Sequence, residues 1–324
     1  MRFGHDEGLL RTQAEDGMVQ TIRYHDDGRI ELYEMDVSDP GVGQVQVQGG
    51  ACGICSWDVA TAKMGNQMKP MAGPGHEGVG YVTKVGADVK GLKEGDRVAG
   101  GGFAATRNLQ AERAYKIPDS DLPDEYWIVE PVSCAVTGID HCQIQPGNRI
   151  AVIGCGFMGQ LIIQGLVRYP LDALIAIDIV QSRLGLASKT GVPEVYHASN
   201  VDPKELKARE FDVVVDTTGS QAGLDLATEI VKRGGKINLF GWIKGEKATF
   251  DPGKWHLGGF TIVNSAPGSK IRETFEPAIR LIHKGIIDLK PLVTHTSTLQ
   301  EYPNLMKRIL AGDESYIKGV VTLS

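Results

Sequence analysis

The first third of the chain alternates apolar and polar residues in short runs. The stretches "GQVQVQGGA" (43–51) and "GYVTKVG" (80–86) repeat with a period of two and are bounded by turn residues. Successive side chains of a β-strand point to opposite faces, so this pattern indicates strands with one buried face. We therefore predict antiparallel β structure in this part of the chain.

From about residue 148 the pattern changes to short apolar runs that alternate with helical spacing. We expect strands at 149–154, 173–179, 211–219, 236–242 and 260–266, and helices at 157–169, 181–191 and 220–235. This alternation predicts an α/β fold, a doubly wound parallel sheet beside the β-rich part. One more amphipathic helix is expected after residue 266, with an apolar stripe of Ile271, Phe275, Ile279 and Ile282.

Length and charge narrow the kind of protein. At 324 residues the chain exceeds one ordinary core, which favours two domains. A net charge of -6 gives no basic surface for nucleic acid or anionic lipid, so a small-molecule partner is favoured. No apolar run has the length of a secretory signal or a membrane span, and five cysteines form no disulfide framework. We therefore expect a cytoplasmic protein that binds neither nucleic acid nor membrane.

A dinucleotide site is predicted at "VIGCGFMG", where Gly154, Gly156 and Gly159 form G-x-G-x-x-G between a strand and a helix. Gly154 permits the turn, Gly156 lets a diphosphate approach the backbone, and Gly159 lets the helix pack closely on the strand. The diphosphate would lie at the helix N-terminus, where free N–H groups favour an anion. Phe157 and Met158 lie in the same turn and are expected to border the cofactor.

Residues further along complete the predicted cofactor site. Asp178 ends the next strand, close to the spacing of about 20 residues at which an acid binds the ribose hydroxyls. Its charge opposes a 2′-phosphate, so NAD is favoured over NADP. Arg183 lies close enough in the sequence to complicate the preference for NAD. The alternative is that Arg183 is a solvent-exposed helix residue. Thr217, Thr218 and Gly219 end a later strand and either approach the nicotinamide or form a simple loop.

A second site is indicated by "GPGHEGVGYVTKVG" (73–86), which places His76 and Glu77 on a glycine-rich stretch. Cys55 precedes them in "ACGICSWDVA" (51–60). A thiolate, an imidazole and a carboxylate form a plausible zinc set, and a catalytic zinc site keeps one coordination position open.

Together, "CGICSWD", "GPGHEGVGYVTKVGADVKGLKEGDRV", "EPVSCAV" and "GNRIAVIGCGFMGQ" resemble the zinc-containing medium-chain dehydrogenase/reductase family of alcohol and polyol dehydrogenases. The resemblance extends from about residue 18 to the end. It implies a GroES-like, β-rich catalytic domain built from residues 1–132 and 266–324, with a Rossmann NAD-binding domain inserted at 133–265. It also implies a homodimer or homotetramer.

The resemblance carries roles to individual residues. Cys55 and His76 match the first two zinc ligands, and Glu77 matches a carboxylate beside the metal that ligates zinc in some members. Glu130 falls where the sorbitol-dehydrogenase-like branch places a glutamate ligand, so this branch is favoured, and which glutamate ligates stays open. Asp58 matches the acid that orients the histidine.

Two departures from the family pattern affect the expected chemistry. The family's Ser or Thr two positions after the first ligand is Trp57 here, and a common histidine three positions later is Ala60, which puts the usual proton relay in doubt. Ser56 would face away from the site if the backbone is extended, and Trp57 either shapes the substrate pocket or packs under the cofactor. Residues 99–118 lack the four cysteines of the family's structural zinc lobe, so one catalytic zinc per chain is expected.

The resemblance implies hydride transfer between a secondary alcohol, such as a polyol, sugar alcohol or cyclitol, and NAD, giving the ketone. Zinc would lower the pKa of the substrate hydroxyl. Two alternatives stay open. One is a zinc-independent medium-chain reductase of an activated double bond or quinone, and the other is a non-catalytic NAD-binding protein.

Overall fold

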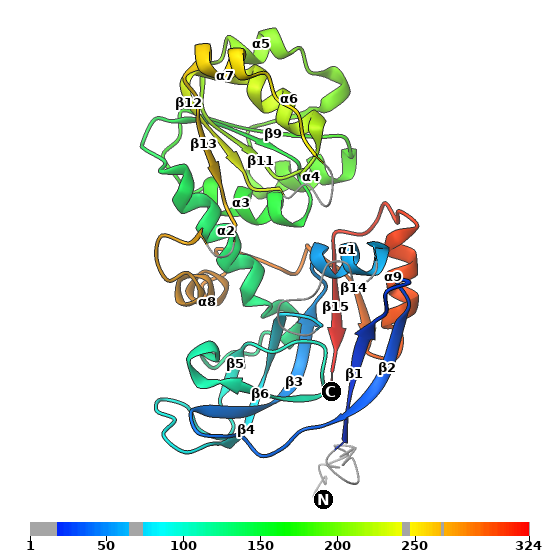
Figure 1. Ribbon diagram of the computed structural model, residues 1–324. Coiled ribbons are helices and arrows are strands. Elements are labelled where there is room, and N and C mark those ends of the chain that lie inside the picture. The colour runs from blue at the N-terminus through cyan, green and yellow to red at the C-terminus, as the bar shows by residue number, and fades with distance from the viewer. Residues whose placement is uncertain (1–17, 65–73, 242–246, 267–268, 324) are drawn as a thin grey trace, which may run out of the picture.

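The computed structural model describes residues 18–64, 74–241, 247–266 and 269–323, which form three sheets (Figure 1). A six-stranded parallel sheet with helices around it lies at one end of the molecule, and a seven-stranded sheet lies at the other. The third sheet is a two-stranded hairpin beside the seven-stranded sheet. No helix in the described ranges is long and apolar enough to cross a membrane.

The seven-stranded sheet combines the beginning and the end of the chain. Its path is β14-β15-β3-β4-β5-β7, and β6 also pairs with β3. β3 and β4 are antiparallel, as their alternating pattern predicts, and the C-terminal β15 pairs antiparallel with β3. The strands are β3 (Gln44–Gly53), β4 (Glu77–Val85), β5 (Arg97–Ala99), β6 (Thr106–Gln110), β7 (Tyr115–Lys116), β14 (Val293–Thr298) and β15 (Lys318–Thr322).

The two-stranded hairpin joins this sheet through a small apolar core. Ile22 and Tyr24 of the hairpin, Ile54 and Tyr302 are buried together. Tyr302 begins one covering helix, and the other follows β3. These elements are β1 (Met18–Tyr24), β2 (Ile30–Asp36), α1 (Ser56–Met64) and α9 (Tyr302–Leu310).

The six-stranded sheet is parallel throughout, in the order β10-β9-β8-β11-β12-β13. This is the strand order of the classic dinucleotide-binding fold. The predicted α/β architecture, a GroES-like β domain with a Rossmann-type parallel sheet, is therefore confirmed. The elements are β8 (Arg149–Ile153), α3 (Phe157–Leu166), β9 (Ala173–Asp178), α4 (Gln181–Thr190), β10 (Glu194–His197), α5 (Pro203–Lys207), β11 (Phe211–Asp216), α6 (Gln221–Ile230), β12 (Val231–Leu239), α7 (Pro252–Gly258) and β13 (Thr261–Asn264).

Two helices connect the sheets. α2 (Val129–Cys142) packs against both α3 and α8 (Phe275–His283), and it lies between the sheets in Figure 1. In the part of the chain that the structure describes there are also three short 3-10 turns, at η3 (Ala111–Arg113), η4 (Asp124–Tyr126) and η5 (Ala198–Asn200). All strands of the parallel sheet lie inside the interval expected for the Rossmann domain, while the exact domain boundaries stay a prediction.

Two predicted elements have other limits in the structure. The helix expected over 220–235 ends at Ile230, because residue 231 leaves helical backbone angles and begins β12. The glycines read as a helix stop lie where the register between β11 and β12 shifts, and Gly234 has a φ of 71°. The strand expected over 236–242 is the second half of β12, which ends at Leu239. Residue 242 lies outside the described residues.

The apolar stripe of the late helix is shorter than predicted. α8 begins at Phe275, so Ile271 precedes the helix and is 63% exposed. The Glu273 carboxylate accepts hydrogen bonds from the backbone N–H groups of Phe275 and Glu276, which satisfies donors at the helix start. Ile279 and Ile282 are buried, as the stripe predicts.

Candidate metal centre and cofactor site

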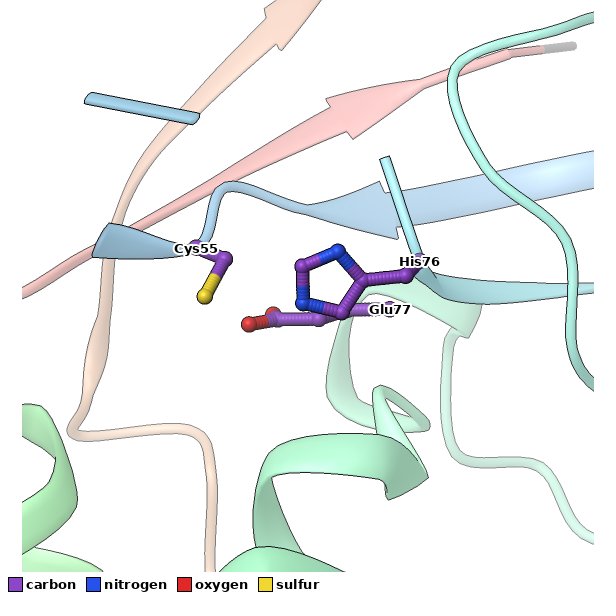
Figure 2. Close-up of side chains that lie close together, drawn as sticks. All are labelled: Cys55, His76 and Glu77. Carbon is purple, nitrogen blue, oxygen red and sulfur yellow. The ribbon is translucent and has the colours of Figure 1, made fainter. Parts of the chain in front are cut away.

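Pairing of β3 with β4 brings the predicted metal-binding residues together. Gly53 lies opposite Glu77 in the two strands, so Cys55, just after β3, lies beside His76 and Glu77 at the start of β4. The ligand atoms of these three side chains all lie within 4.8 Å of one another, and Figure 2 shows them converging. Zinc ligands at bonds of about 2.0–2.3 Å lie about 3.3–3.8 Å apart, so small rotations of the side chains would suffice.

The donor set suits zinc in its chemistry as well as its spacing. Sulfur, nitrogen and carboxylate oxygen are the protein ligands of zinc. Burial, with the neighbouring charge of Glu77, raises the pKa of the Cys55 thiol to about 12. The free thiol is therefore protonated at neutral pH, and binding of a cation would release its proton.

Lys318, which the sequence did not reveal, neutralises Glu77. Its Nζ lies 2.5 Å from the Glu77 Oε2, and the two side chains are only 4% and 2% exposed. The ammonium also donates to the Ile54 carbonyl at 2.9 Å and lies 4.5 Å from the centre of the Phe157 ring. Burial alone would lower the pKa of Lys318, but the negative charges of Glu77 and of a Cys55 thiolate raise it above its ordinary value. Lys318 therefore connects the metal centre to the first residue of α3.

A glycine makes room for this ion pair. A Cβ on Gly53 would overlap the Oε2 of Glu77 and would lie 3.1 Å from the Cε of Lys318. Only a residue without a side chain fits there, because both charged groups approach the β3 backbone from the same side.

Glu130 lies outside the set of ligand atoms within 4.8 Å, yet it faces the same region. It is in the first turn of α2, where its Oε1 accepts a hydrogen bond of 3.3 Å from the Cys134 thiol. Burial raises the pKa of the Glu130 carboxyl most, and the charge of Glu77 raises it further, whereas His76 lowers it. No cation of the described chain pairs with Glu130.

Asp58 is hydrogen-bonded to the turn that carries Cys55 and to the N-terminal hairpin. Its Oδ2 accepts a 2.8 Å hydrogen bond from the Cys55 backbone N–H, and its Oδ1 accepts one of 3.4 Å from the Tyr24 hydroxyl. Burial raises the pKa of the Asp58 carboxyl to about 6, and the charge of the His76 imidazole acts in the opposite direction. Within the described residues, no hydrogen bond joins the two side chains. Asp58 thus holds the turn that carries Cys55, and its expected role in orienting His76 stays a prediction.

The residues after Cys55 are helical, which corrects the extended backbone considered for Ser56. Ser56 and Trp57 are the first two residues of α1, and Ser56 is exposed while Trp57 is partly exposed. The carbonyl of Trp57 accepts a hydrogen bond from Thr61 one turn later. The helix begins here because Asp58, its third residue, reaches back to the N–H of Cys55, one half of a capping box.

The glycine loop between β8 and α3 has the form that the dinucleotide motif requires. Gly154 has a φ of 91°, and a Cβ there would lie 2.6 Å from the Thr217 Oγ1. A Cβ on Gly159 would overlap the carbonyl of Gly154. A Cβ on Gly156 would meet nothing within 4 Å, so this loop leaves open space at the N-terminus of α3, where Phe157 begins the helix. The loop therefore fits a diphosphate.

Asp178 connects this loop to β9. Its Oδ2 accepts a 2.5 Å hydrogen bond from the Cys155 N–H, and its Oδ1 accepts one of 2.7 Å from the Val180 N–H. Arg183 is not the solvent-exposed helix residue that was one alternative. It is partly buried, and its guanidinium donates to the Tyr316 carbonyl at 3.3 Å.

The Thr217–Gly219 turn follows β11 at the same edge of the parallel sheet. Thr217 donates to the Gly154 carbonyl at 2.8 Å, and Thr218 donates to Asp216 at 2.7 Å. Gly219 has a φ of 62°. The threonine hydroxyls therefore hold the turn against the glycine loop, which places this turn beside the predicted cofactor site.

Comparison with known proteins assigns the chain to a class. The family model for the alcohol dehydrogenase GroES-like domain matches residues 41–119, and the model for zinc-binding dehydrogenases matches residues 158–284. With the fold above, these matches show that the chain belongs to the zinc-binding medium-chain dehydrogenases, which use NAD(P).

Individual relatives are distant but nearly full-length. An alcohol dehydrogenase of Moraxella sp. (strain TAE123) is 28% identical, over 81% of this chain and 89% of the relative. Sorbitol dehydrogenase of Bacillus subtilis is 25% identical, over 92% and 95%. A solved alcohol dehydrogenase from E. coli CFT073, complexed with NADH, superposes with a TM-score of 0.83 at 22% identity, covering 94% of this chain and 99% of that one.

Proposed function

We propose that this protein transfers a hydride between a secondary alcohol, of the polyol, sugar-alcohol or cyclitol class, and NAD, with one catalytic zinc per chain and the ketone as product. The observation that carries the proposal is the convergence of Cys55, His76 and Glu77 beside the glycine loop. Sorbitol dehydrogenase among the relatives supports the polyol class.

Cys55, His76 and a glutamate would hold the zinc. Because Lys318 already neutralises Glu77, we favour Glu130 as the third protein ligand, with Glu77 next to the metal. Glu130 lies in the first turn of α2, has no cationic partner among the described residues, and is close enough to Glu77 and His76 for their charges to act on its carboxyl. Residues 99–118 contain no cysteine, so they cannot hold a second, structural zinc through four cysteines.

When bound, zinc supplies the Lewis acidity that lowers the pKa of the substrate hydroxyl, and the nicotinamide ring accepts the hydride. The protein positions both. The open space at Gly156 and the N–H groups of α3 would hold the diphosphate, while free lone pairs on the Asp178 carboxylate would accept ribose hydroxyls. The negative charge of Asp178 would repel a 2′-phosphate, so we propose NAD as the preferred cofactor. Thr217, Thr218 and Gly219 would border the nicotinamide end.

Two other functions make different predictions. A zinc-independent reductase of an activated double bond or quinone has no use for a convergent Cys, His and Glu set. A non-catalytic NAD-binding protein would bind zinc and NAD but oxidise no alcohol; only the absence of a hydroxyl at Trp57 favours it. We further propose a cytoplasmic homodimer or homotetramer, as the family resemblance implies.

Elemental mass spectrometry of protein purified without chelator tests the metal centre. We expect about one zinc per chain in the wild type and a large loss of zinc and turnover in Cys55→Ser, with NAD affinity in calorimetry nearly unchanged. Glu130→Gln should lose more zinc than Glu77→Gln if Glu130 is the ligand. A wild type that holds no zinc, even after zinc is added back, would reject the zinc mechanism.

A further inference from the structure

The peptide bond before Cys55 is held at both ends by buried charged side chains. Its carbonyl, on Ile54, accepts a 2.9 Å hydrogen bond from the Lys318 ammonium. Its N–H, on Cys55, donates to the Asp58 carboxylate at 2.8 Å. Lys318 and Asp58 are both buried, so these charge-assisted bonds are strong. The direction in which the chain leaves β3 toward the Cys55 side chain is therefore fixed by two other elements, α1 and β15.

A chain of two buried tyrosine hydroxyls ends on the other oxygen of Asp58. The Tyr24 hydroxyl donates to its Oδ1 at 3.4 Å, and the hydroxyls of Tyr24 and Tyr302 lie 2.5 Å apart. A carboxylate only accepts and each hydroxyl has one proton, so Tyr302 donates to Tyr24 and Tyr24 donates to Asp58. Tyr24 and Tyr302 are 7% and 0% exposed, and they come from β1 and α9. The N-terminal hairpin and a C-terminal helix thus reach the Cys55 turn through one chain of hydrogen bonds.

The Tyr302 ring also packs toward the turn that leads to His76. Its centroid lies 4.9 Å from that of the fully buried Phe103 ring. The Phe103 N–H donates to the Pro74 carbonyl at 3.1 Å. A Cβ on Gly75, which has a φ of 76°, would lie 2.7 Å from the Phe103 nitrogen and 2.8 Å from its Cδ2. Phe103 therefore lies tightly against the residue immediately before His76, and only glycine permits that approach.

Tyr302 is therefore the residue at which the supports of two predicted zinc ligands meet. Its hydroxyl leads to Cys55 and its ring leads to His76. Zinc bonds of about 2.0–2.3 Å tolerate little variation in the separation of two ligands. We propose that Tyr302 and Tyr24 are positioning residues of the metal centre, which fix the separation of its thiol and imidazole ligands and so raise its affinity for zinc. The inference rests on the metal centre of the proposed function and extends that centre to the N-terminal hairpin and α9.

Competition with a chelator of known zinc affinity measures the effect. Tyr24→Phe should weaken zinc binding about 10-fold, the low end of the range for groups behind metal ligands, because its 3.4 Å bond is a long one. Tyr302→Phe keeps the ring beside Phe103 and should weaken binding less, since its hydroxyl acts only through Tyr24. Tyr302→Leu also removes the ring that packs toward His76, and it should weaken binding more than Tyr302→Phe.

Tyr81 provides the matched control. Its hydroxyl also donates to a carboxylate, that of Asp124, at 3.2 Å. Tyr81 lies further along β4 than Glu77 and is 40% exposed. Tyr81→Phe should leave the zinc affinity unchanged. Equal losses of zinc affinity in Tyr81→Phe and Tyr24→Phe would be a general effect of hydroxyl removal and would overturn the proposal.

Melting temperature and zinc affinity together separate a positioning role from a structural one. Tyr24→Phe leaves the buried Tyr302 hydroxyl without its acceptor and should lower the melting temperature of the chelator-treated protein. Tyr24→Phe/Tyr302→Phe removes both hydroxyls, so the melting temperature should recover. The zinc affinity should stay low, because Asp58 still lacks its support. Recovery of the zinc affinity together with the melting temperature indicates a structural role and contradicts the proposal.

Hydrogen exchange distinguishes this inference from the proposed function. The Cys55 N–H is bonded to Asp58 without bound metal, so Tyr24→Phe should speed exchange in the peptide fragment that contains Cys55 and leave a fragment from β8 unchanged. A wild type that binds no zinc rejects the proposed function, and the exchange rates still decide whether the tyrosines hold Cys55. A wild type that binds zinc and oxidises an alcohol, with unchanged zinc affinity in Tyr24→Phe, rejects the positioning role alone.

Discussion

Removal of the Lys318 ammonium should leave the Glu77 carboxylate buried without a counter-charge. The two groups are 2.5 Å apart and nearly inaccessible to water. Breaking such a pair from one side costs about 3–5 kcal/mol, whereas a neutral replacement of both partners is often tolerated. We therefore expect Lys318→Met to lose about 3–5 kcal/mol of unfolding free energy, and Lys318→Met/Glu77→Gln to recover most of it.

Guanidinium titration of the chelator-treated protein, followed by tryptophan fluorescence at pH 7, measures the effect without bound zinc. The pKa of Lys318 is raised in the folded protein. The stabilisation is therefore complete below the unfolded pKa of about 10.4 and is lost only as the pH rises through the folded pKa. At neutral pH the ion pair therefore makes its full contribution to stability.

A surface pair provides the matched control. Lys84 and Asp39 also lie 2.5 Å apart, but their side chains are 54% and 81% exposed. Lys84→Met should cost no more than about 1 kcal/mol, because water screens exposed charges. The reasoning is refuted if Lys318→Met costs as little as Lys84→Met, or if the double variant is less stable than Lys318→Met alone.

Two further substitutions test the cofactor loop and the space around the ion pair. Asp178→Ala should shift the ratio of kcat/KM values toward NADP by about 10-fold or more, the size of one charge-assisted contact. It should also weaken the binding of both dinucleotides, because the N–H groups of Cys155 and Val180 lose their acceptor. An unchanged NADP-to-NAD ratio would remove Asp178 from this role. Gly53→Ala should cost about 1–3 kcal/mol and reduce bound zinc, because its methyl group would overlap Glu77. Thermal melting and zinc analysis measure both effects. Gly185→Ala is the control, since a Cβ there meets nothing within 4 Å. Equal stability and zinc content in the two variants would contradict the steric argument.

The fold was largely predictable because its signals are local. Alternating residues in β3 and β4, and the glycine loop between β8 and α3, each depend on a few neighbouring positions. Short β10 and the early start of β12 gave no comparable signal, because β12 continues past two glycines through a shift in register with β11.

The site was predictable only in part, because its electrostatics depend on distant residues. Cys55, His76 and Glu77 were identified by their type and order, and the strand pairing brings them together. Nothing near Lys318 in the sequence points to Glu77.

The C-terminal strand also has a consequence for synthesis on the ribosome. β15 lies between β14 and β3, and Lys318 donates to Ile54 across 264 positions of the chain. The strands of the parallel sheet emerge together and can fold while translation continues, whereas the Ala51–Gly53 end of β3 must wait for a partner made after all of them. Until then residues 51–53 lack their β15 partner and Glu77 lacks Lys318, so the metal centre matures late and a short strand edge beside it stays open to pairing with other chains.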